Sequence, residues 1–330
     1  MRTIDWVDGA VEIIDQTVLP TAERHLRLST VDELVAAIQR LAVRGAPALG
    51  VAGAFGVALA AQCHGADSAA VADAVRRVAH ARPTAVNLAR GVARAAARLA
   101  EGADAVLAEA LAVRDEEVAA SLAMAARGAD LVTEVCPMAV PRLLTHCNTG
   151  GLAAVVGGTA LGVVAELHRR GRLGGVIASE TRPLLQGARL TAWELGRLGI
   201  PYRVAVDGAG PFLMARGEVD AVILGADRVC GNGDVVNKVG TYAHALGAAR
   251  AGIPFVVVAP ESTVDTGTAC GSDVDIEDRG PAEVLSFGGT GTAPAGAGAA
   301  NPAFDVTPAD LVTAIVTDRR VIRADRGDRP

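Results

Sequence analysis

Ionisable and hydrogen-bonding residues follow several short β-branched segments in the second half of this sequence. These segments alternate with helix-length stretches, which is typical of a parallel sheet covered on both faces. Because ligands bind beyond the carboxyl ends of parallel strands, we expect these residues to meet in one polar crevice. They are residues 146–150, 180–182 and 261–263, together with Asp207, Asp227 and Arg228.

Cys147 and Asp227 are the candidate reactive groups of this crevice. Cys147 lies between a strand and a glycine pair that starts a helix, where free amides and the helix dipole stabilise a thiolate. Asp227 follows an apolar segment, so desolvation would keep it protonated as a general acid. The alternatives are a small buried apolar side chain for Cys147 and an ion pair with Arg228 or Arg182 for Asp227.

Two further segments place a cation before a helix start, a pattern that suits phosphate. In NGDVVNKVG (232–240), Lys238 precedes helical amides, and in RGAP (44–47), Arg44 stands beside a glycine and before Pro47. The alternative for Arg44 is a solvated arginine in a turn. No G-x-G-x-x-G turn follows the first strand of the sheet, and the sequence has no Walker motif, no G-x-S-x-G elbow and no zinc-ligand spacing.

Composition excludes other classes of protein. The net charge is −6 and only 3% of the residues are aromatic, so we expect no nucleic-acid partner. The five cysteines are scattered and the N-terminus is acidic, which favours a reducing, cytoplasmic location. The apolar stretches 46–61 and 150–167 are rich in Ala and Gly, and we expect buried core helices there rather than membrane spans.

The length of 330 residues predicts two domains. The first, residues 1–130, is expected to be mainly helical. Its strands are predicted at 4–7 and 11–14, and its helices after the Thr30 cap, from Pro47, from Pro83, at 84–99 and at 104–126.

The second domain, residues 131–330, is expected to be a Rossmann-like catalytic domain with a parallel sheet, so the fold class is α/β. Its strands are predicted at 142–145, 175–179, 202–206, 221–224 and 255–259, its helices at 152–170, 187–198, 208–216 and 237–251, and a surface loop at 286–300.

At these motifs the sequence resembles the methylthioribose-1-phosphate isomerase family, which shares its fold with regulatory subunits of translation initiation factor 2B. The resemblance covers nearly the whole chain. It rests on RGAPALG (44–50), RPTAVNL (82–88), THCNTGGLA (145–153), ETRPLLQGARLTAWEL (180–195), GADRVCGNGDVVNKVGTY (225–242), IPFVVVAPESTVD (253–265) and NPAFDVTP (301–308).

The resemblance implies an aldose-ketose isomerase of methionine salvage that acts on a small phosphorylated sugar, 5-methylthio-α-D-ribose 1-phosphate, without metal or organic cofactor. It implies Cys147 as the catalytic thiol, Asp227 as the proton donor, and a homodimer without a membrane partner. The residues implied in substrate binding are Arg44, Gly45, Ala46, Arg82, Gln186, Asn237 and Lys238.

The sequence departs from the family pattern at VDGAGPFLM (206–214) and in the tail TDRRVIRADRGDRP. These departures leave the group on carbon 5 of the sugar open, so 5-deoxyribose 1-phosphate and ribose 1,5-bisphosphate are alternative substrates. A proton or a hydride route from C2 to C1 is equally compatible with these residues. A non-catalytic regulatory subunit is the alternative from another class, and the presence of both Cys147 and Asp227 speaks against it.

Overall fold

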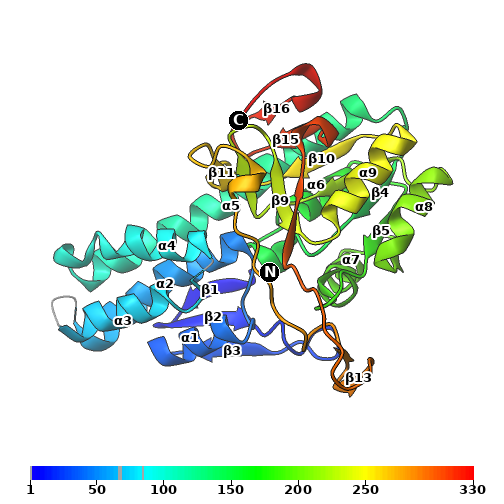
Figure 1. Cartoon of the computed structure of the whole chain (residues 1–330). Coiled ribbons are helices and arrows are strands. Elements are labelled where there is room, and N and C mark those ends of the chain that lie inside the picture. Colours follow the sequence, from blue (N-terminus) through cyan, green and yellow to red (C-terminus); the bar gives the residue numbers. More distant parts are fainter. Residues whose placement is uncertain (1, 66–68, 84) are drawn as a thin grey trace. The chain divides into compact units, whose positions relative to one another are not determined.

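The protein has a mixed α/β fold (Figure 1), seen in a computed structural model that describes residues 2–65, 69–83 and 85–330. The chain forms two compact units. Unit 1 comprises residues 1–122 and 149–158, and unit 2 comprises residues 123–148 and 159–330. The division lies inside one long helix, a little before the predicted boundary at residue 130, and the segment 149–158 returns to unit 1.

Unit 1 combines an antiparallel sheet with helices, drawn in blue and cyan in Figure 1. The sheet has the order β1-β2-β3, with β1 (Ile4–Val7), β2 (Ala10–Ile14) and β3 (His25–Leu28). The helices are α1 (Val31–Gln39), α2 (Ala46–His64), α3 (Ala69–Ala79), α4 (Val86–Ala96) and the first part of α5 (Ala103–Val135). The predicted capping box of α1 is confirmed, because Glu33 N–H donates to Thr30 Oγ1 and Thr30 N–H donates to Glu33.

Helix α2 forms the centre of the unit 1 core. Its residues from Pro47 to Ala61 are all buried, which agrees with its apolar character on every side. Among the described residues it is the one helix long and apolar enough to cross a membrane, and 83% of its most apolar window is buried within the protein. The expectation of a core helix at 46–61 is confirmed.

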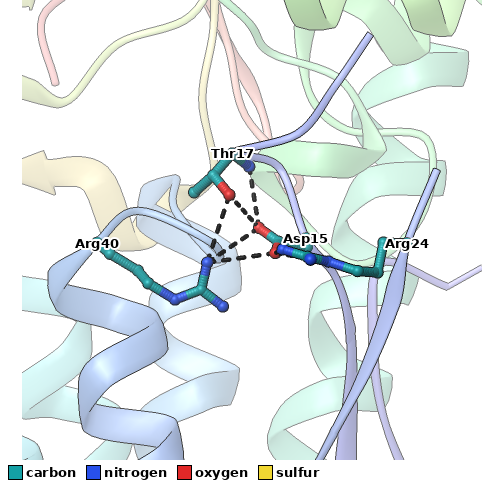
Figure 2. A network of polar contacts seen from close by, with 4 residues as sticks. All are labelled: Asp15, Thr17, Arg24 and Arg40. Atoms are coloured by element: carbon teal, nitrogen blue, oxygen red, sulfur yellow. Dashed lines mark hydrogen bonds and ion pairs between the residues drawn. The ribbon is translucent and has the colours of Figure 1, made fainter. Parts of the chain in front are cut away.

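A buried carboxylate, Asp15, ties the segment after β2 to the end of α1 (Figure 2). Arg24 and Arg40 donate to its carboxylate, Arg40 at 3.2 Å, and the Thr17 hydroxyl donates at 2.6 Å. Burial alone would raise the pKa of Asp15, but these donors outweigh it and lower the pKa to about 2. The ionised form of Asp15 therefore stabilises unit 1.

Asp15→Asn should lower the free energy of unfolding by about 2 kcal/mol at pH 7. Because the folded pKa lies below the unfolded value, this contribution is complete above about pH 4 and is lost as the pH falls towards about 2. Urea unfolding at pH 7 and pH 3 measures it, and the difference between the two proteins should shrink at pH 3. Asp32→Asn, which removes the exposed ion pair with Arg77, is the matched control with an expected effect under about 0.5 kcal/mol.

Unit 2 contains a seven-stranded sheet of order β16-β15-β10-β7-β4-β5-β6. Its neighbours pair in parallel, except that β16 is antiparallel to β15. Strand β4 is central, the next two strands in the chain lie on one side, and later ones lie on the other, as in doubly wound sheets. The strands are β4 (Arg142–Thr145), β5 (Gly175–Ser179), β6 (Tyr202–Ala205), β7 (Ala221–Leu224), β10 (Phe255–Val258), β15 (Ala314–Val316) and β16 (Val321–Ile322).

A second, four-stranded sheet of unit 2 has the order β11-β8-β9-β14. Its strands are β11 (Val264–Asp265), β8 (Arg228–Cys230), β9 (Val235–Lys238) and β14 (Phe304–Thr307), and β12 (Ser286–Phe287) and β13 (Thr290–Gly291) form a separate short hairpin. The helices are α6 (Ala160–Arg169), a π-helical turn (Gly187–Thr191) that continues as α7 (Ala192–Arg197), α8 (Gly210–Ala215) and α9 (Thr241–Ala251).

The predicted strands 142–145, 175–179 and 221–224 are confirmed residue for residue. Two predicted helices are wrong in part. The helix expected at 152–170 is a 3-10 turn (Gly151–Ala153), a glycine-containing loop and then α6. The helix expected at 237–251 begins at Thr241, because Asn237 and Lys238 pair with β14 and Gly240 has a φ of 105°. The helix expected from Pro83 begins at Val86, and Thr84 is outside the described residues.

Candidate functional site

The carboxyl ends of the parallel strands of unit 2 lie at one edge of the main sheet. Cys147 comes two residues after β4, Thr181 two residues after β5, and Asp207 two residues after β6. Asp227 follows β7 and leads directly into β8 of the smaller sheet. The expected gathering of polar residues at this edge agrees with the topology.

The backbone of Cys147 is held on both sides in a left-handed conformation, with a φ of 61°. Its N–H donates to Thr181 Oγ1 at 2.9 Å, and its carbonyl accepts from Thr191 Oγ1 at 2.6 Å. The residue is half-buried, so the thiol is not an ordinary core side chain. An accessible thiol on a fixed backbone is suited to chemistry on a bound molecule.

Lys238 is a buried cation that interacts electrostatically with both candidate reactive groups. It lies at the end of β9 and is only 6% exposed. Burial lowers the pKa of Lys238, whereas the nearby charges of Cys147, Glu283 and Asp227 act in the opposite direction. One buried ammonium is therefore close enough to interact electrostatically with both Cys147 and Asp227.

The environment expected for Asp227 is wrong. The residue is exposed, because the chain leaves the buried strand β7 at Leu224 and crosses to the smaller sheet. Of the two arginines considered as partners, Arg228 pairs with Asp265 at 2.9 Å. Arg182 donates to the carbonyls of Glu283 and Val284. Asp227 is therefore accessible from solvent in this structure.

Two other predicted binding residues of unit 2 are buried. Asn237 donates from Nδ2 to Thr241 Oγ1 at 2.9 Å. Gln186 precedes the π-helical turn, and its buried Oε1 has no hydrogen-bond partner among the described residues. The next residue must be glycine, because a Cβ on Gly187 would stand 1.7 Å from the Ser179 carbonyl oxygen. This close approach brings Gln186 back to the end of β5.

The remaining predicted binding residues, Arg44, Gly45, Ala46 and Arg82, belong to unit 1. Gly45 precedes α2 with a φ of 96°, and a Cβ there would lie 2.3 Å from the Ala153 carbonyl oxygen. Only glycine allows this contact between the start of α2 and the segment after Gly151. Arg44, Ala46 and Arg82 are half-buried.

The N-terminus of α9 does not offer its first amides to an outside anion, contrary to expectation. Asp305, on β14, accepts from Gly240 N–H at 2.7 Å and from Tyr242 N–H at 3.2 Å. Its other carboxyl oxygen is buried and has no hydrogen-bond partner among the described residues. Burial raises the pKa of Asp305 to about 6 despite these two donors. In this segment the role of Lys238 toward phosphate stays a prediction.

Asp305→Asn should stabilise the protein at pH 8 and have little effect at pH 5. The folded pKa exceeds the unfolded one, so the stability gained from the protonated carboxyl is present below about pH 4 and is lost as the pH rises through about 6. Asparagine still accepts from the two amides and carries no charge. We expect the melting temperature to rise by about 2 °C or more at pH 8. An equal shift at both pH values would contradict this account.

Two groupings of residues near the site were not predicted, although His146 itself was expected in the polar crevice. His146 and His244 are buried, with ring centroids 5.0 Å apart, and burial lowers the pKa of both, that of His244 to about 3. The second group surrounds Glu283, which pairs with Arg279 at 2.5 Å and accepts from Asn301 at 3.2 Å. His146 and Asn301 lie inside motifs quoted above and His244 lies just after one, whereas Arg279 and Glu283 lie outside all of them. In the described ranges, no group of three or more His, Cys, Asp or Glu residues is arranged to hold a metal ion.

The structure defines a mixed α/β protein whose candidate site residues, a thiol, a carboxyl and a buried lysine, belong to one unit. The Initiation factor 2 subunit family matches residues 42–324, which is most of the chain. The chain belongs to this family.

Similar proteins carry more specific names. A methylthioribose-1-phosphate isomerase from Anaeromyxobacter sp. (strain K) is 54% identical over 95% of this chain and 91% of its own length. A 5-deoxyribose 1-phosphate isomerase from Moorella thermoacetica is 48% identical over 97% of this chain and 93% of its own. The chain spans 61% of a probable bifunctional methylthioribose-1-phosphate isomerase/methylthioribulose-1-phosphate dehydratase from Nocardia farcinica, at 53% identity.

Solved structures agree with these similarities. The 5-methylthioribose 1-phosphate isomerase from Pyrococcus horikoshii OT3 has a TM-score of 0.91 at 40% identity, covering 98% of this chain and 92% of that one. A structure described as translation initiation factor 2B, subunit delta, from A. fulgidus has a TM-score of 0.88 at 41% identity, covering 98% and 96%.

Proposed function

We propose that this protein is an aldose-ketose isomerase that converts 5-methylthio-α-D-ribose 1-phosphate to 5-methylthio-D-ribulose 1-phosphate, a step of methionine salvage. The names of relatives at about half identity over almost the entire chain support this activity. The observation that carries it is the fixed Cys147 at the end of β4, in the same unit as Asp227 after β7 and the buried Lys238. A phosphorylated pentose needs such a cation close to its reacting groups.

The chemistry requires help with ring opening. The anomeric oxygen of the substrate carries the phosphate, so the sugar cannot open to a free aldehyde as an ordinary aldose does. Asp227 is proposed to donate a proton to the ring oxygen as the bond between C1 and that oxygen breaks. Hydrogen then moves from C2 to C1, and the C2 hydroxyl returns its proton to the Asp227 carboxylate as the C2 carbonyl forms. Cys147 acts as the base in a proton route, or stabilises developing charge in a hydride route.

The proposed binding residues contact different parts of the substrate. Lys238 would pair with the phosphate, and its burial strengthens that pairing because little water competes. The buried Oε1 of Gln186 would accept from a sugar hydroxyl, which would satisfy an atom without a partner among the described residues. Arg44, Arg82, the Gly45–Ala46 segment and Asn237 complete the proposed set, and the reaction requires neither metal nor organic cofactor.

The substituent on carbon 5 is the part of the substrate for which more than one candidate stands. The Moorella relative is named for 5-deoxyribose 1-phosphate at 48% identity, so that sugar is the second candidate. Ribose 1,5-bisphosphate is less favoured, because a second phosphate calls for another group of cations. A non-catalytic subunit is disfavoured by the presence of Cys147 and Asp227.

Purified protein should be assayed for ketose formation with methylthioribose 1-phosphate, 5-deoxyribose 1-phosphate and ribose 1,5-bisphosphate. The highest kcat/KM is expected for the methylthio sugar. A clear preference for the 5-deoxy sugar would change the proposed substrate but not the proposed type of reaction. No ketose from any of the three sugars, in a sample that melts cooperatively, would refute the isomerase proposal.

The domain organisation, the oligomeric state and the cellular location of the enzyme are also proposed. We infer two domains, a Rossmann-like catalytic domain and a smaller, mainly helical one, as well as a homodimer and a cytoplasmic location. The strand order of the main sheet supports the first of these. Light scattering on the purified protein measures the mass in solution, and a mass close to 33.4 kDa would exclude the dimer.

A further inference from the structure

Three residues other than glycine adopt a left-handed backbone at the edge of the sheet where the site lies. They are Cys147 at a φ of 61°, Thr181 at 67° and Leu185 at 57°. Side chains with a Cβ are strained in this region, and such residues persist only where their surroundings hold them. The contacts that hold Thr181 and Cys147 are therefore part of how the site is built.

Asp207 supplies the first of these contacts. One carboxylate oxygen accepts from the Ser179 hydroxyl at 2.5 Å and from Thr181 N–H at 2.7 Å. The other oxygen accepts from Arg182 N–H at 2.7 Å. Burial raises the pKa of Asp207, but these three donors outweigh it and lower the pKa, so the carboxylate is ionised. A single side chain thus fixes two successive amides of the loop after β5.

Thr181 transmits this order to Cys147. The residue is fully buried, and its hydroxyl donates to the Ser179 carbonyl at 3.0 Å. Because the hydroxyl proton is used there, the oxygen is free to accept from Cys147 N–H, which it does at 2.9 Å. The orientation of the Cys147 backbone therefore depends on where Asp207 holds Thr181.

We propose that Asp207 is a positioning residue for the reaction, which holds Cys147 in its left-handed conformation through Thr181 and so fixes the direction of its thiol. This inference rests on the proposed function only in taking Cys147 as the reactive thiol. The competing explanation is that Asp207 merely stabilises a loop. That explanation predicts a lower melting temperature with unchanged thiol behaviour.

Four variants separate these explanations. Asp207→Asn has the same shape, but its Nδ2 atom only donates hydrogen bonds, so the backbone N–H that faced the replaced carboxylate oxygen loses its acceptor. Thr181→Val removes the acceptor for Cys147 N–H without a large change in volume, and Thr181→Ser keeps it. Thr145→Val is the matched control, because the buried Thr145 hydroxyl has no hydrogen-bond partner among the described residues.

Two measurements are made on each variant: kcat and KM with methylthioribose 1-phosphate, and the rate at which iodoacetamide labels Cys147. Peptide mass spectrometry gives that rate relative to the exposed Cys63 in the same sample. In Asp207→Asn and in Thr181→Val we expect kcat to fall about tenfold or more, with KM within about threefold of wild type. The labelling ratio should fall about threefold or more, because the sulfur no longer keeps the position that the fixed backbone gives it. Thr181→Ser and Thr145→Val should resemble wild type.

The double variant Asp207→Asn, Thr181→Val tests whether both residues act along one path. Its kcat should be no lower than that of the more impaired single variant, because both changes break the same chain of hydrogen bonds from Asp207 through Thr181 to Cys147. Multiplicative losses, or an unchanged labelling ratio in both single variants, would overturn the positioning role. The labelling ratio requires no turnover, so a shifted ratio in a protein without isomerase activity would refute the proposed function and leave the positioning role standing.

Discussion

Cys147→Ser should lower kcat by about a thousandfold or more while the substrate still binds. The substitution replaces sulfur by oxygen on a backbone that two threonine hydroxyls already fix. Serine keeps the shape, but its hydroxyl ionises far less readily than a thiol. It can therefore neither accept a proton from C2 nor carry negative charge near Lys238 at neutral pH. Because Cys147 is not the proposed phosphate contact, the dissociation constant should change by less than about threefold.

Ketose formation and equilibrium binding of methylthioribose 1-phosphate measure these two effects separately. Cys63→Ser is the matched control, because that thiol is exposed and lies in unit 1. It should retain full activity. Turnover near the wild-type rate in Cys147→Ser would remove the thiol from the mechanism, whereas loss of binding would indicate that the residue contacts the substrate more than it reacts with it.

The strands of the main sheet could be predicted from the sequence because their pattern is local. β4, β5 and β7 are short runs of buried, mostly branched residues that end at polar ones, and the residues after them are the candidate site. The strand β9 could not be predicted in this way. Asn237 and Lys238 are polar, and they belong to a strand only because β14, far along the chain, pairs with them.

The same limit explains the errors at the site. The exposure of Asp227 follows from the path of the chain between two sheets, which hydrophobic pattern does not contain. The contact between Asp305 and the amides of α9 joins segments that are distant in sequence. The left-handed backbone at Thr181 could not be predicted from the sequence, because threonine normally avoids this conformation. The sequence motifs identified the candidate residues, but only the tertiary structure shows which groups surround each of them.

Asp227→Asn should lower kcat by about a hundredfold or more. The proposed reaction needs a proton delivered to the ring oxygen, and asparagine has the shape of aspartic acid but cannot supply one. The backbone of Asp227 is fixed, because its N–H donates to the Val236 carbonyl at 2.9 Å, so the variant should keep the position of the side chain. A loss of kcat with little change in KM is therefore expected.

The exposure of Asp227 in the free protein makes the pH dependence of this variant informative. If the bound sugar covers the carboxyl, the wild-type enzyme gains its proton donor only in the complex. The profile of kcat against pH should then show a descending limb as the donor loses its proton, and Asp227→Asn should lack that limb. Asp265→Asn is the matched control, because it removes a carboxylate that pairs with Arg228 on the adjoining strand. An identical limb in Asp227→Asn, together with turnover near the wild-type rate, would assign the proton to another group.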